Sequence, residues 1–575
     1  MKKLLQTTAA VALLSAVIAG SALPSAFAAD TAAPAAAASL QSYTLNDSLQ
    51  VEIKSVLSQR VKGGTLLGAV VRLTNTSGKV TRVPDYEVRL KADDGTEYTL
   101  QPSSTNVPSV SAKSSRELSY MLTIDRTDEV NVANIVWVDV DYYVYPKLET
   151  VKLDVPTSGV VWQGDETEIR TADAIKKWGD SFTIPSLHSP LVYTPVDIVR
   201  DYSGEKPVSI VQMLVENPSK ERQALPDLAM DGKSATDVYF GSLVDKTPII
   251  LESGEKRYVH FAIEMELDST ELRSLNVLTT EQHVTGDVSQ PFRIGRVNIL
   301  LPAKEVAGVL PAGPKYEFGT PIAFDKLNKL IHPNLEVSLV ELHVQENEND
   351  GYKTAIAKFK LLNKSDRNLP VPSFGTQLQS GDGYEYVGYA QSNPAKLIVP
   401  GAATAVAYSF TVPKSQQIED LQLSLFDSQT IKPYKSVIAA VHPSIQVEET
   451  ERVTELNMYP LKVTINDWRA VTNFDLQTGY TYKLKLDLDI EQDEQAIIDA
   501  SSPKLRLEVV NTSGKLIGVV PELSFAGVNA LQDGSNTVSI QGTTEQLETP
   551  FTINVYESFT NTNGELAKRL ISTLK

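Results

Sequence analysis

An acidic stretch at residues 487–494 is the first place where this chain could bind a metal ion. Its carboxylates are those of Asp487, Asp489, Glu491, Asp493 and Glu494. Carboxylate oxygens suit Ca²⁺, but a calcium loop adds a turn glycine and lacks strict alternation. Here Asp487 and Asp489 alternate with leucines, which is typical of the solvent-facing side of an amphipathic strand. We therefore expect a strand at this position, and calcium binding by residues 487–494 stays open as an alternative.

Other combinations of residues that carry out chemistry are missing from the sequence. The chain has no cysteine, which excludes disulfides, thiolate metal sites and cysteine nucleophiles. Its six histidines are dispersed, without the spacing of zinc ligands. No Gly-x-Ser-x-Gly elbow or phosphate-binding glycine loop occurs. We expect no catalytic residue, no cofactor and no metal ion, and therefore a protein that is not an enzyme.

Tyrosines provide the best candidate for a binding surface. One group follows an apolar, alternating segment at residues 135–140, and the other flanks a turn at Asp382-Gly383. Tyrosine suits a contact surface because it combines a large apolar ring with a hydroxyl group. In the alternative interpretation, half of each group packs inward. The six candidates are Tyr142, Tyr143, Tyr145, Tyr384, Tyr386 and Tyr389.

A scaffold of strands must position these side chains. In four segments apolar residues fall on every second position, and each segment opens a similar unit: 49–53, 195–199, 335–339 and 461–465. A second strand then ends, in three of the units, at an asparagine suited to a turn: Asn75, Asn217 and Asn363. A proline, a polar turn and further alternating segments follow in the same order each time. The chain therefore consists of repeats of one pattern.

Each unit contains about seven short strands separated by Gly, Pro and Asn turns, which indicates a β-sandwich. The pattern resembles tandem immunoglobulin-like repeats of bacterial secreted and surface proteins, at the level of strand pattern only. The Cys and Trp core of antibody domains is not present. The resemblance implies an all-β protein with four tandem immunoglobulin-like β-sandwich domains in an elongated array.

The expected boundaries follow from the repeat and from short joining segments. They are a signal peptide 1–28, a flexible leader 29–41, repeat 42–156, linker 157–182, repeat 183–301, linker 302–330, repeat 331–442, linker 443–458 and repeat 459–575.

The first residues predict export. Lys2 and Lys3 precede an apolar stretch, and Ala26-Phe27-Ala28 is a small-x-small cleavage site. We expect cleavage after Ala28, an extracellular or cell-surface location, and no transmembrane segment in the mature chain. The net charge is −18 without a basic cluster, so the sequence does not predict binding to nucleic acid.

These observations predict a secreted, non-enzymatic cell-envelope protein that acts as a structural or adhesive scaffold or as a binding array. Its expected partner is a cell-wall polymer or an envelope protein. The alternative is a soluble extracellular binding module, or an accessory subunit of an envelope transport or sensing complex. A carbohydrate-active enzyme is a remote alternative, because two catalytic carboxylates can lie far apart in a chain.

Overall fold

The computed structural model describes residues 40–575, except for 158, 166, 168, 170, 204, 267–270, 303–313, 347–350, 418–420 and 478. The predicted signal peptide, most of the predicted leader and part of the predicted linker 302–330 therefore lie outside the described residues. The described chain is all-β, as the sequence predicts. Its helical content is two 3₁₀ turns, Ala172–Ala174 and Pro185–Leu187, within the described ranges.

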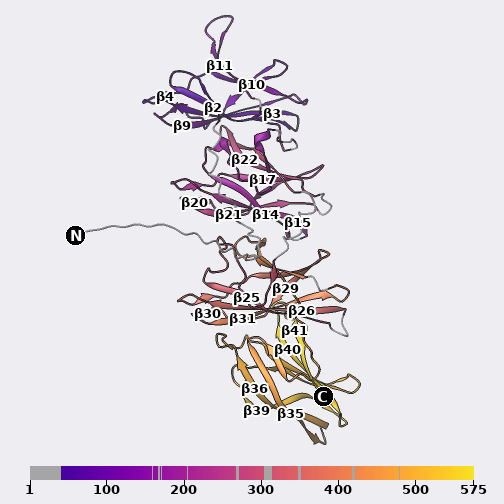
Figure 1. Ribbon diagram of the computed structural model, residues 1–575. Coiled ribbons are helices and arrows are strands. Elements are labelled where there is room, and N and C mark those ends of the chain that lie inside the picture. Colours follow the sequence, from indigo (N-terminus) through magenta and orange to yellow (C-terminus); the bar gives the residue numbers. More distant parts are fainter. Residues whose placement is uncertain are drawn as a thin grey trace, which may run out of the picture.

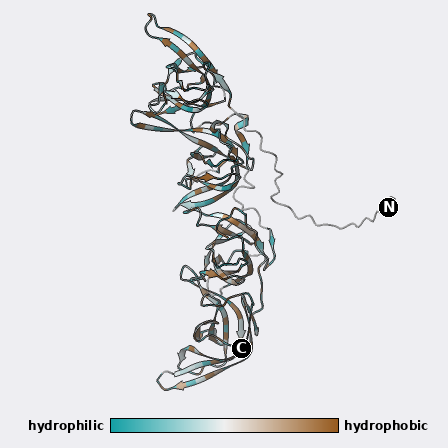
Figure 2. Ribbon diagram, turned by 90° about the vertical axis from the view of Figure 1, so that its left-hand side faces the viewer, coloured by the Kyte–Doolittle hydropathy of each residue, from teal (hydrophilic) through white to brown (hydrophobic). Residues whose placement is uncertain are grey.

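Four β-rich parts follow one another along a single axis (Figure 1). Each is built around its own cluster of buried apolar side chains. We call them units 1 to 4; their clusters span residues 45–155, 182–299, 322–441 and 456–574. Apolar and polar residues intermix along the strands of all four units (Figure 2), as expected for sheets that bury one face.

Unit 1 is a sandwich of two antiparallel sheets. The first contains β1 (Ser42–Thr44), β2 (Leu49–Val61), β3 (Gly64–Asn75), β9 (Ser115–Ile124) and β7 (Gln101–Pro102), in this order, with β12 (Val161–Trp162) parallel to β2. The second contains β11 (Leu148–Pro156), β10 (Val132–Asp141), β5 (Glu87–Ala92) and β6 (Glu97–Thr99). The apolar cluster fills the space between the two sheets, since it draws side chains from both.

Units 2 to 4 contain the same two layers, but one strand in each unit pairs with both layers and joins them into a continuous path. Unit 2 has the order β13 (Ile175–Lys177), β23 (Val288–Leu300), β22 (Ser274–Thr285), β17 (Leu228–Lys233), β19 (Gly241–Leu243), β21 (Lys256–Glu264), β15 (Lys206–Glu216) and β14 (Val192–Ser203), with β18 (Val238–Tyr239) beside β17. Unit 3 has the order β24 (Lys315–Tyr316), β33 (Ser436–Pro443), β32 (Leu421–Asp427), β28 (Gly375–Ser380), β29 (Glu385–Ala390), β31 (Ala403–Pro413), β26 (Tyr352–Asn363) and β25 (Leu335–Glu346). Unit 4 has the order β34 (Glu455–Met458), β35 (Leu461–Asp475), β36 (Gly479–Gln492), β39 (Gly534–Thr544), β38 (Leu516–Leu523), β37 (Lys504–Asn511), β40 (Phe551–Thr560) and β41 (Leu566–Leu574).

Two β-bulges recur in every unit. The first lies between the first two long strands, at Ile53/Ser55, Pro195/Asp197, Leu339/Glu341 and Ile465/Asp467. The second lies between the last two strands, at Trp137/Val138, Val277/Leu278, Leu425/Phe426 and Val555/Tyr556. A bulge fixes the strand register locally. The bulges therefore align the four units residue by residue.

The asparagines that recur in the sequence, Asn75, Asn217 and Asn363, are each fully buried. Their hydrogen bonds explain why the sequence repeats them. Asn363 Nδ2 donates to the carbonyl oxygens of Arg367 (2.7 Å) and Ile398 (2.8 Å), and its Oδ1 accepts from Ser365 N. The other two asparagines make equivalent bonds. In each case the side chain ties the end of a long strand to a small two-stranded sheet: β4 (Thr81–Arg82) with β8 (Ser109–Val110), β16 (Gln223–Ala224) with β20 (Ile250–Leu251), or β27 (Leu369–Pro370) with β30 (Leu397–Ile398).

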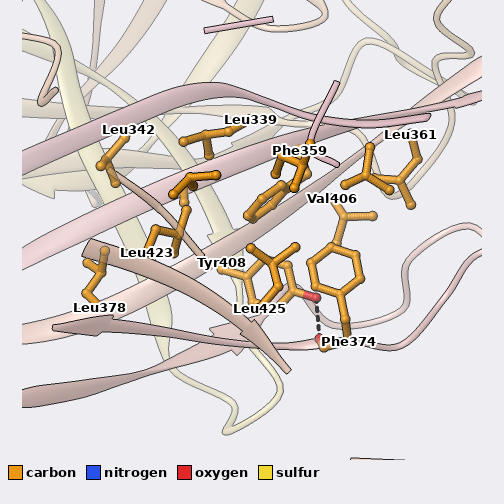
Figure 3. Close-up of a cluster of buried hydrophobic side chains, with 14 of the residues drawn as sticks. Leu339, Leu342, Phe359, Leu361, Phe374, Leu378, Val406, Tyr408, Leu423 and Leu425 are labelled. Carbon is orange, nitrogen blue, oxygen red and sulfur yellow. Dashed lines mark hydrogen bonds between the residues drawn. The ribbon is translucent and has the colours of Figure 1, made fainter. Parts of the chain in front are cut away.

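The core of unit 3 shows how the two layers interlock (Figure 3). The ring of Phe359 contacts those of Phe374 and Tyr408 edge to face, with centroids 5.3 and 5.6 Å apart. The hydroxyl group of Tyr408 donates a hydrogen bond of 2.7 Å to the carbonyl oxygen of Phe374. The ring thereby fills the core while its polar atom stays bonded, which a buried hydroxyl requires.

Candidate binding site: the free hairpin of unit 1

Units 1 and 2 meet through an apolar contact of their own. Leu57, Leu66, Val70 and Met121 lie on the outer face of β2, β3 and β9, the face turned away from the core of unit 1. They pack against Leu278, Phe292 and Ile294 of β22 and β23 and against Trp162 of the joining segment. Because the same sheet face would otherwise meet water, this contact stabilises one relative orientation of the two units.

Buried charges surround that contact. Lys54 Nζ lies 2.7 Å from a carboxylate oxygen of Glu117 and 3.0 Å from one of Glu281. Arg296 donates to the carboxylate of Glu281 and to the carbonyl oxygen of Lys54, both at 2.8 Å. Lys54, Glu281 and Arg296 are less than a tenth exposed. Removing one partner would leave a buried charge uncompensated, so the network holds units 1 and 2 in register.

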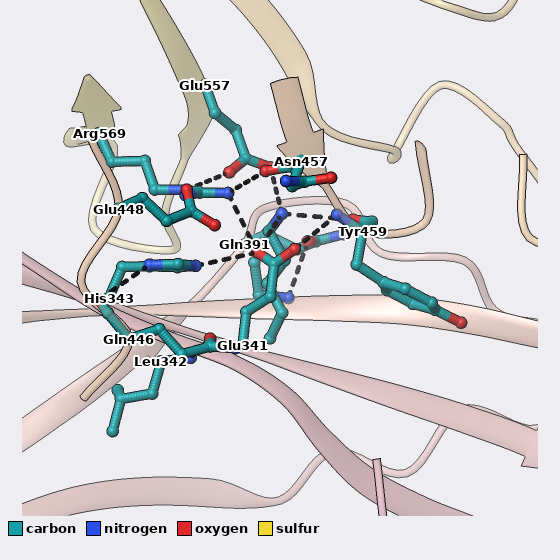
Figure 4. A network of polar contacts seen from close by, with 12 residues as sticks. Glu341, Leu342, His343, Gln391, Gln446, Glu448, Asn457, Tyr459, Glu557 and Arg569 are labelled. Atoms are coloured by element: carbon teal, nitrogen blue, oxygen red, sulfur yellow. Dashed lines mark hydrogen bonds and ion pairs between the residues drawn. The ribbon is translucent and has the colours of Figure 1, made fainter. Parts of the chain in front are cut away.

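Units 3 and 4 meet through a more extensive polar network (Figure 4). Lys358 of unit 3 forms ion pairs with Glu341 at 2.8 Å and with Glu557 of unit 4. Arg569 of unit 4 bonds to Glu557 at 2.6 Å and to Glu448 at 3.0 Å. Burial alone would raise the pKa of Glu557, but Lys358 and Arg569 outweigh it and hold this pKa below its usual value. The carboxylate therefore stays ionised inside the joint.

Backbone pairing adds to the joint between units 3 and 4. Ala403 N donates to Gln495 O at 2.7 Å, and Ile497 N donates to Ala403 O at 2.9 Å. Ser392 N donates to Thr560 O at 2.8 Å. Main-chain bonds between units restrict rotation about the joint, because the groups that make them cannot move without leaving unpaired donors.

The joint between units 2 and 3 is smaller. Val208, Ile210 and Ala262 on the outer face of unit 2 pack against Ile431, from the turn between β32 and β33. Lys435 N donates to Asp201 at 3.0 Å, and the hydroxyl group of Tyr258 donates to Asp325 at 2.9 Å.

All three joints have the same geometry. The hairpin formed by the last two strands of one unit, or its turn, lies on the outer face of the first long strands of the preceding unit. In unit 1 the corresponding hairpin is β10–β11, and it projects from the end of the array (Figure 1). We call residues 132–156 the free hairpin.

The free hairpin carries one of the two predicted tyrosine groups. Tyr143 and Tyr145 are fully exposed, and Tyr142 is 66% exposed. Val144, Leu148 and Val151 are also exposed. Tyr142 donates a hydrogen bond from its hydroxyl group to the carboxylate of Glu87. The structure therefore brings Tyr142, Tyr143 and Tyr145 together at one tip, where exposed aromatic side chains are suited to a contact.

The second predicted group is spread over unit 3. Tyr384 is exposed in the turn between β28 and β29. Tyr386 is buried and donates from its hydroxyl group to Gln416 at 2.9 Å, and Tyr389 is half-buried on β29. These three tyrosines do not share one exposed surface.

A charged cluster supports the free hairpin beside its turn, since Glu149 is the second residue of β11. Arg89, which is 8% exposed, lies between Glu87, Glu97 and Glu149, with guanidinium-to-carboxylate distances of 3.2 Å to Glu97 and 3.0 Å to Glu149. Bonds from Arg89 and Lys147 lower the pKa of Glu149 to about 2. The hairpin is thus tied to β5 and β6 as well as to its own partner strand.

Sequence reasoning missed the charged residues of the joints and the apolar residues Leu148 and Val151 of the free hairpin. Lys54 and Glu341 sit beside the bulge, but both strands carry further polar residues, so no local pattern marks these two charges. No group of three or more acidic or histidine side chains is arranged to hold a metal ion in the part of the chain that the structure describes. Within the same part, no helix has the length and apolar character needed to cross a membrane.

The solved structures that resemble the chain include two weak likenesses. An uncharacterised β-sandwich protein from Clostridium difficile 630 is 11% identical, with a TM-score of 0.17, over 24% of this chain and 95% of that one. The YadV chaperone is 9% identical, with a TM-score of 0.12, over 44% of this chain and 99% of that one. No model of a known protein family matches the chain, and no characterised protein sequence matches it.

Proposed function

We propose that this protein is a secreted, non-enzymatic scaffold of the cell envelope, which holds the free hairpin at a distance as its contact end. The observation that carries the proposal is the construction of the joints. Buried ion pairs, apolar contacts and main-chain bonds link successive units. Among the four described units, the hairpin of unit 1 is left without a neighbouring unit. A stiff spacer with a contact end suits a structural or adhesive role.

We further propose that the four units are immunoglobulin-like domains. In unit 1 the strands β2, β3, β5, β9, β10 and β11 follow the chain order of strands A, B, C, E, F and G of that fold. The two sheets then group A, B and E on one side and C, F and G on the other, as in immunoglobulin domains. The recurring bulges support the same assignment for units 2 to 4.

Export and location belong to the same proposal. The N-terminal pattern that ends at Ala28 supports cleavage and release outside the cytoplasm. The expected partner is an envelope component, either a cell-wall polymer or a protein.

A soluble accessory subunit of an envelope transport or sensing complex is the second candidate. The exposed tip at Tyr143 and Tyr145 favours it, because accessory proteins often bind their complex through one apolar patch. The two candidates differ in whether the long axis stays stiff.

Small-angle X-ray scattering of residues 29–575 tests the scaffold. A stiff array gives a scattering profile that matches the four units in the arrangement of Figure 1. A profile that requires freely jointed units contradicts the scaffold and leaves the accessory subunit.

Cosedimentation with purified cell-wall sacculi then separates the partners. Retention in moderate salt that is lost in the variant Tyr143→Ser/Tyr145→Ser indicates a wall polymer at the tip. The matched control is Tyr202→Ser, which removes an exposed tyrosine of unit 2. Recovery in the supernatant indicates a protein partner.

A further inference from the structure

The second bulge aligns the free hairpin of unit 1 with the hairpin by which unit 2 docks onto unit 1. Beside this bulge, Trp137 pairs with Leu153 in unit 1, and Val277 pairs with Val297 in unit 2. Counting from these two pairs gives every residue of the free hairpin a counterpart in β22 or β23.

Four of the residues through which unit 2 contacts unit 1 have chemically similar counterparts, whereas a fifth, Ile294, corresponds to the polar Thr150. Leu278 and Phe292 belong to the apolar contact, and Glu281 and Arg296 form the ion pair beside it. The corresponding pairs are Leu278 with Val138, Phe292 with Leu148, Glu281 with Asp141, and Arg296 with Lys152. Two apolar residues, an acid and a base thus recur at the same register positions.

The surroundings of these counterparts differ. Phe292 is 6% exposed in its contact with unit 1, whereas Leu148 is 58% exposed. Asp141 and Lys152 are exposed as well. Val138 is 2% exposed and is therefore already covered within unit 1. Val151 stands at the place of Gly295, where an added Cβ would lie 2.5 Å from the ring of Trp162. A partner of the free hairpin therefore needs no tryptophan at this position, because Val151 fills the same space.

The outer sheet face of unit 4 lacks the apolar residues through which unit 1 contacts the hairpin of unit 2. The first bulge aligns unit 4 with unit 1, so that Leu57, Leu66, Val70 and Met121 correspond to Arg469, Lys483, Asp487 and Thr537. All four of these unit 4 residues are exposed. A polar outer face is typical of a terminal repeat that ends an array. Unit 4 therefore does not offer the face that the free hairpin requires.

We propose that the free hairpin docks onto the outer sheet face of a β-sandwich domain in another protein, as unit 2 docks onto unit 1. The partner face has an apolar centre of the Leu, Val and Met type. It places a lysine near Asp141, as Lys54 lies near Glu281, and a carbonyl oxygen near Lys152, as Lys54 O lies near Arg296. The inference rests on the proposed function, in which the free hairpin is the contact end.

The test introduces into unit 4 the side chains of the outer sheet face by which unit 1 contacts unit 2. The altered chain carries Arg469→Leu, Lys483→Leu, Asp487→Val, Thr537→Met and Asn466→Lys, the last because Asn466 corresponds to Lys54. The free hairpin of one molecule should then dock onto unit 4 of the next, and a head-to-tail contact of this kind does not close. We expect the weight-average mass in analytical ultracentrifugation to rise by at least about twofold over the unaltered chain.

The control places Leu148→Glu and Lys152→Glu in the altered chain, so that the new face stays but the hairpin is damaged. Loss of the assembly in this control supports the proposal. An altered chain that stays monomeric overturns it, and so does assembly that persists in the control, because the new face is then merely adhesive. Assembly of the unaltered chain would overturn the choice of a foreign partner in favour of a second copy.

A second variant covers the case in which the altered chain does not fold. It places the residues of the free hairpin into the hairpin of unit 2: Leu278→Val, Glu281→Asp, Phe292→Leu and Arg296→Lys. We expect the scattering profile to keep the contact between units 1 and 2, and separation of these units overturns the inference. Stiffness of the unaltered chain is measured independently, so failure of the scaffold proposal and failure of this inference are distinguishable.

Discussion

Lys358 of unit 3 and Glu557 of unit 4 form an ion pair in which each side chain is 1% exposed. The two residues lie about two hundred positions apart in the chain and belong to different units, on β26 and β40. Glu341 and Arg569 complete the network around them. The pair therefore reports directly on whether units 3 and 4 are in contact.

Substitution of Lys358 by Ala should destabilise this joint by about 3–5 kcal/mol, because Glu557 then stays buried without its cation. Chemical unfolding, monitored through the loss of the contact between units 3 and 4, measures the effect. The double variant Lys358→Met/Glu557→Met should recover much of this loss, since it removes both charges.

The control for this variant is Lys575→Ala, which breaks an ion pair with Glu451 whose side chains are 43% and 71% exposed. Exposed pairs contribute about 0–1 kcal/mol, so its unfolding should change little. Equal effects of Lys358→Ala and Lys575→Ala would show that the buried pair does not hold the joint.

The all-β class could be predicted because alternating apolar residues follow from the pleat of a strand. The acidic stretch illustrates this: Asp487 and Asp489 are exposed on β36, as their alternation with leucines indicates. The pattern does not show what covers the other face of a sheet. Lys358 alternates with Ala357 and Phe359 as a solvent-facing lysine would, yet unit 4 buries it.

The candidate site was partly predictable for the same reason. Tyr142, Tyr143 and Tyr145 follow an alternating strand directly, so a turn was the natural place for them. Tyr386 could not be separated from Tyr384 by spacing, because β29 begins between them, at Glu385, and turns one side chain inward. The proposed contact role of Leu148 and Lys152 follows only from the register of β10 with β11, which no local pattern specifies.

The contact between units 1 and 2 should fail in the variant Gly295→Val. An added Cβ would lie 2.5–2.8 Å from ring atoms of Trp162, so the tryptophan must leave its place or the two units must separate. We expect a red shift of tryptophan emission and a less extended scattering profile. Gly78→Ala is the matched control, because Gly78 is exposed and has open space for a Cβ. Unchanged emission in Gly295→Val would contradict the packing described for Trp162.

Acid should weaken unit 2 through His260. Burial lowers the pKa of His260 to about 4, whereas the nearby Asp427 acts in the opposite direction. A histidine in the unfolded chain has a pKa of about 6.5, so between pH 6.5 and 4 the unfolded state binds a proton that the folded state does not. The contribution of the neutral ring is complete above pH 6.5 and decreases as the pH falls through this window.

Unfolding midpoints measured from pH 8 to pH 4 check this prediction. The variant His260→Gln should lose part of the decrease below pH 6.5, because glutamine does not titrate. The difference between the two profiles isolates His260 from other acidic and basic groups. Parallel profiles of the variant and the unaltered chain would show that His260 is not buried in its neutral form.

Asn217 should be required for the stability of unit 2 in particular. Its Nδ2 donates to the carbonyl oxygens of Glu221 (2.8 Å) and Leu251 (3.1 Å), and its Oδ1 accepts from Ser219 N (3.1 Å). The variant Asn217→Ala leaves the buried carbonyl oxygen of Leu251 without this donor, which costs about 1–3 kcal/mol. Hydrogen exchange followed by mass spectrometry should show faster exchange in β15 and β20 and unchanged exchange in unit 4. Asn473→Ala, at an exposed position of β35, serves as the control and should leave exchange in β15 and β20 unaltered. Faster exchange throughout the chain in Asn217→Ala would mean that the units unfold together, and that the asparagine supports the array instead of its own unit.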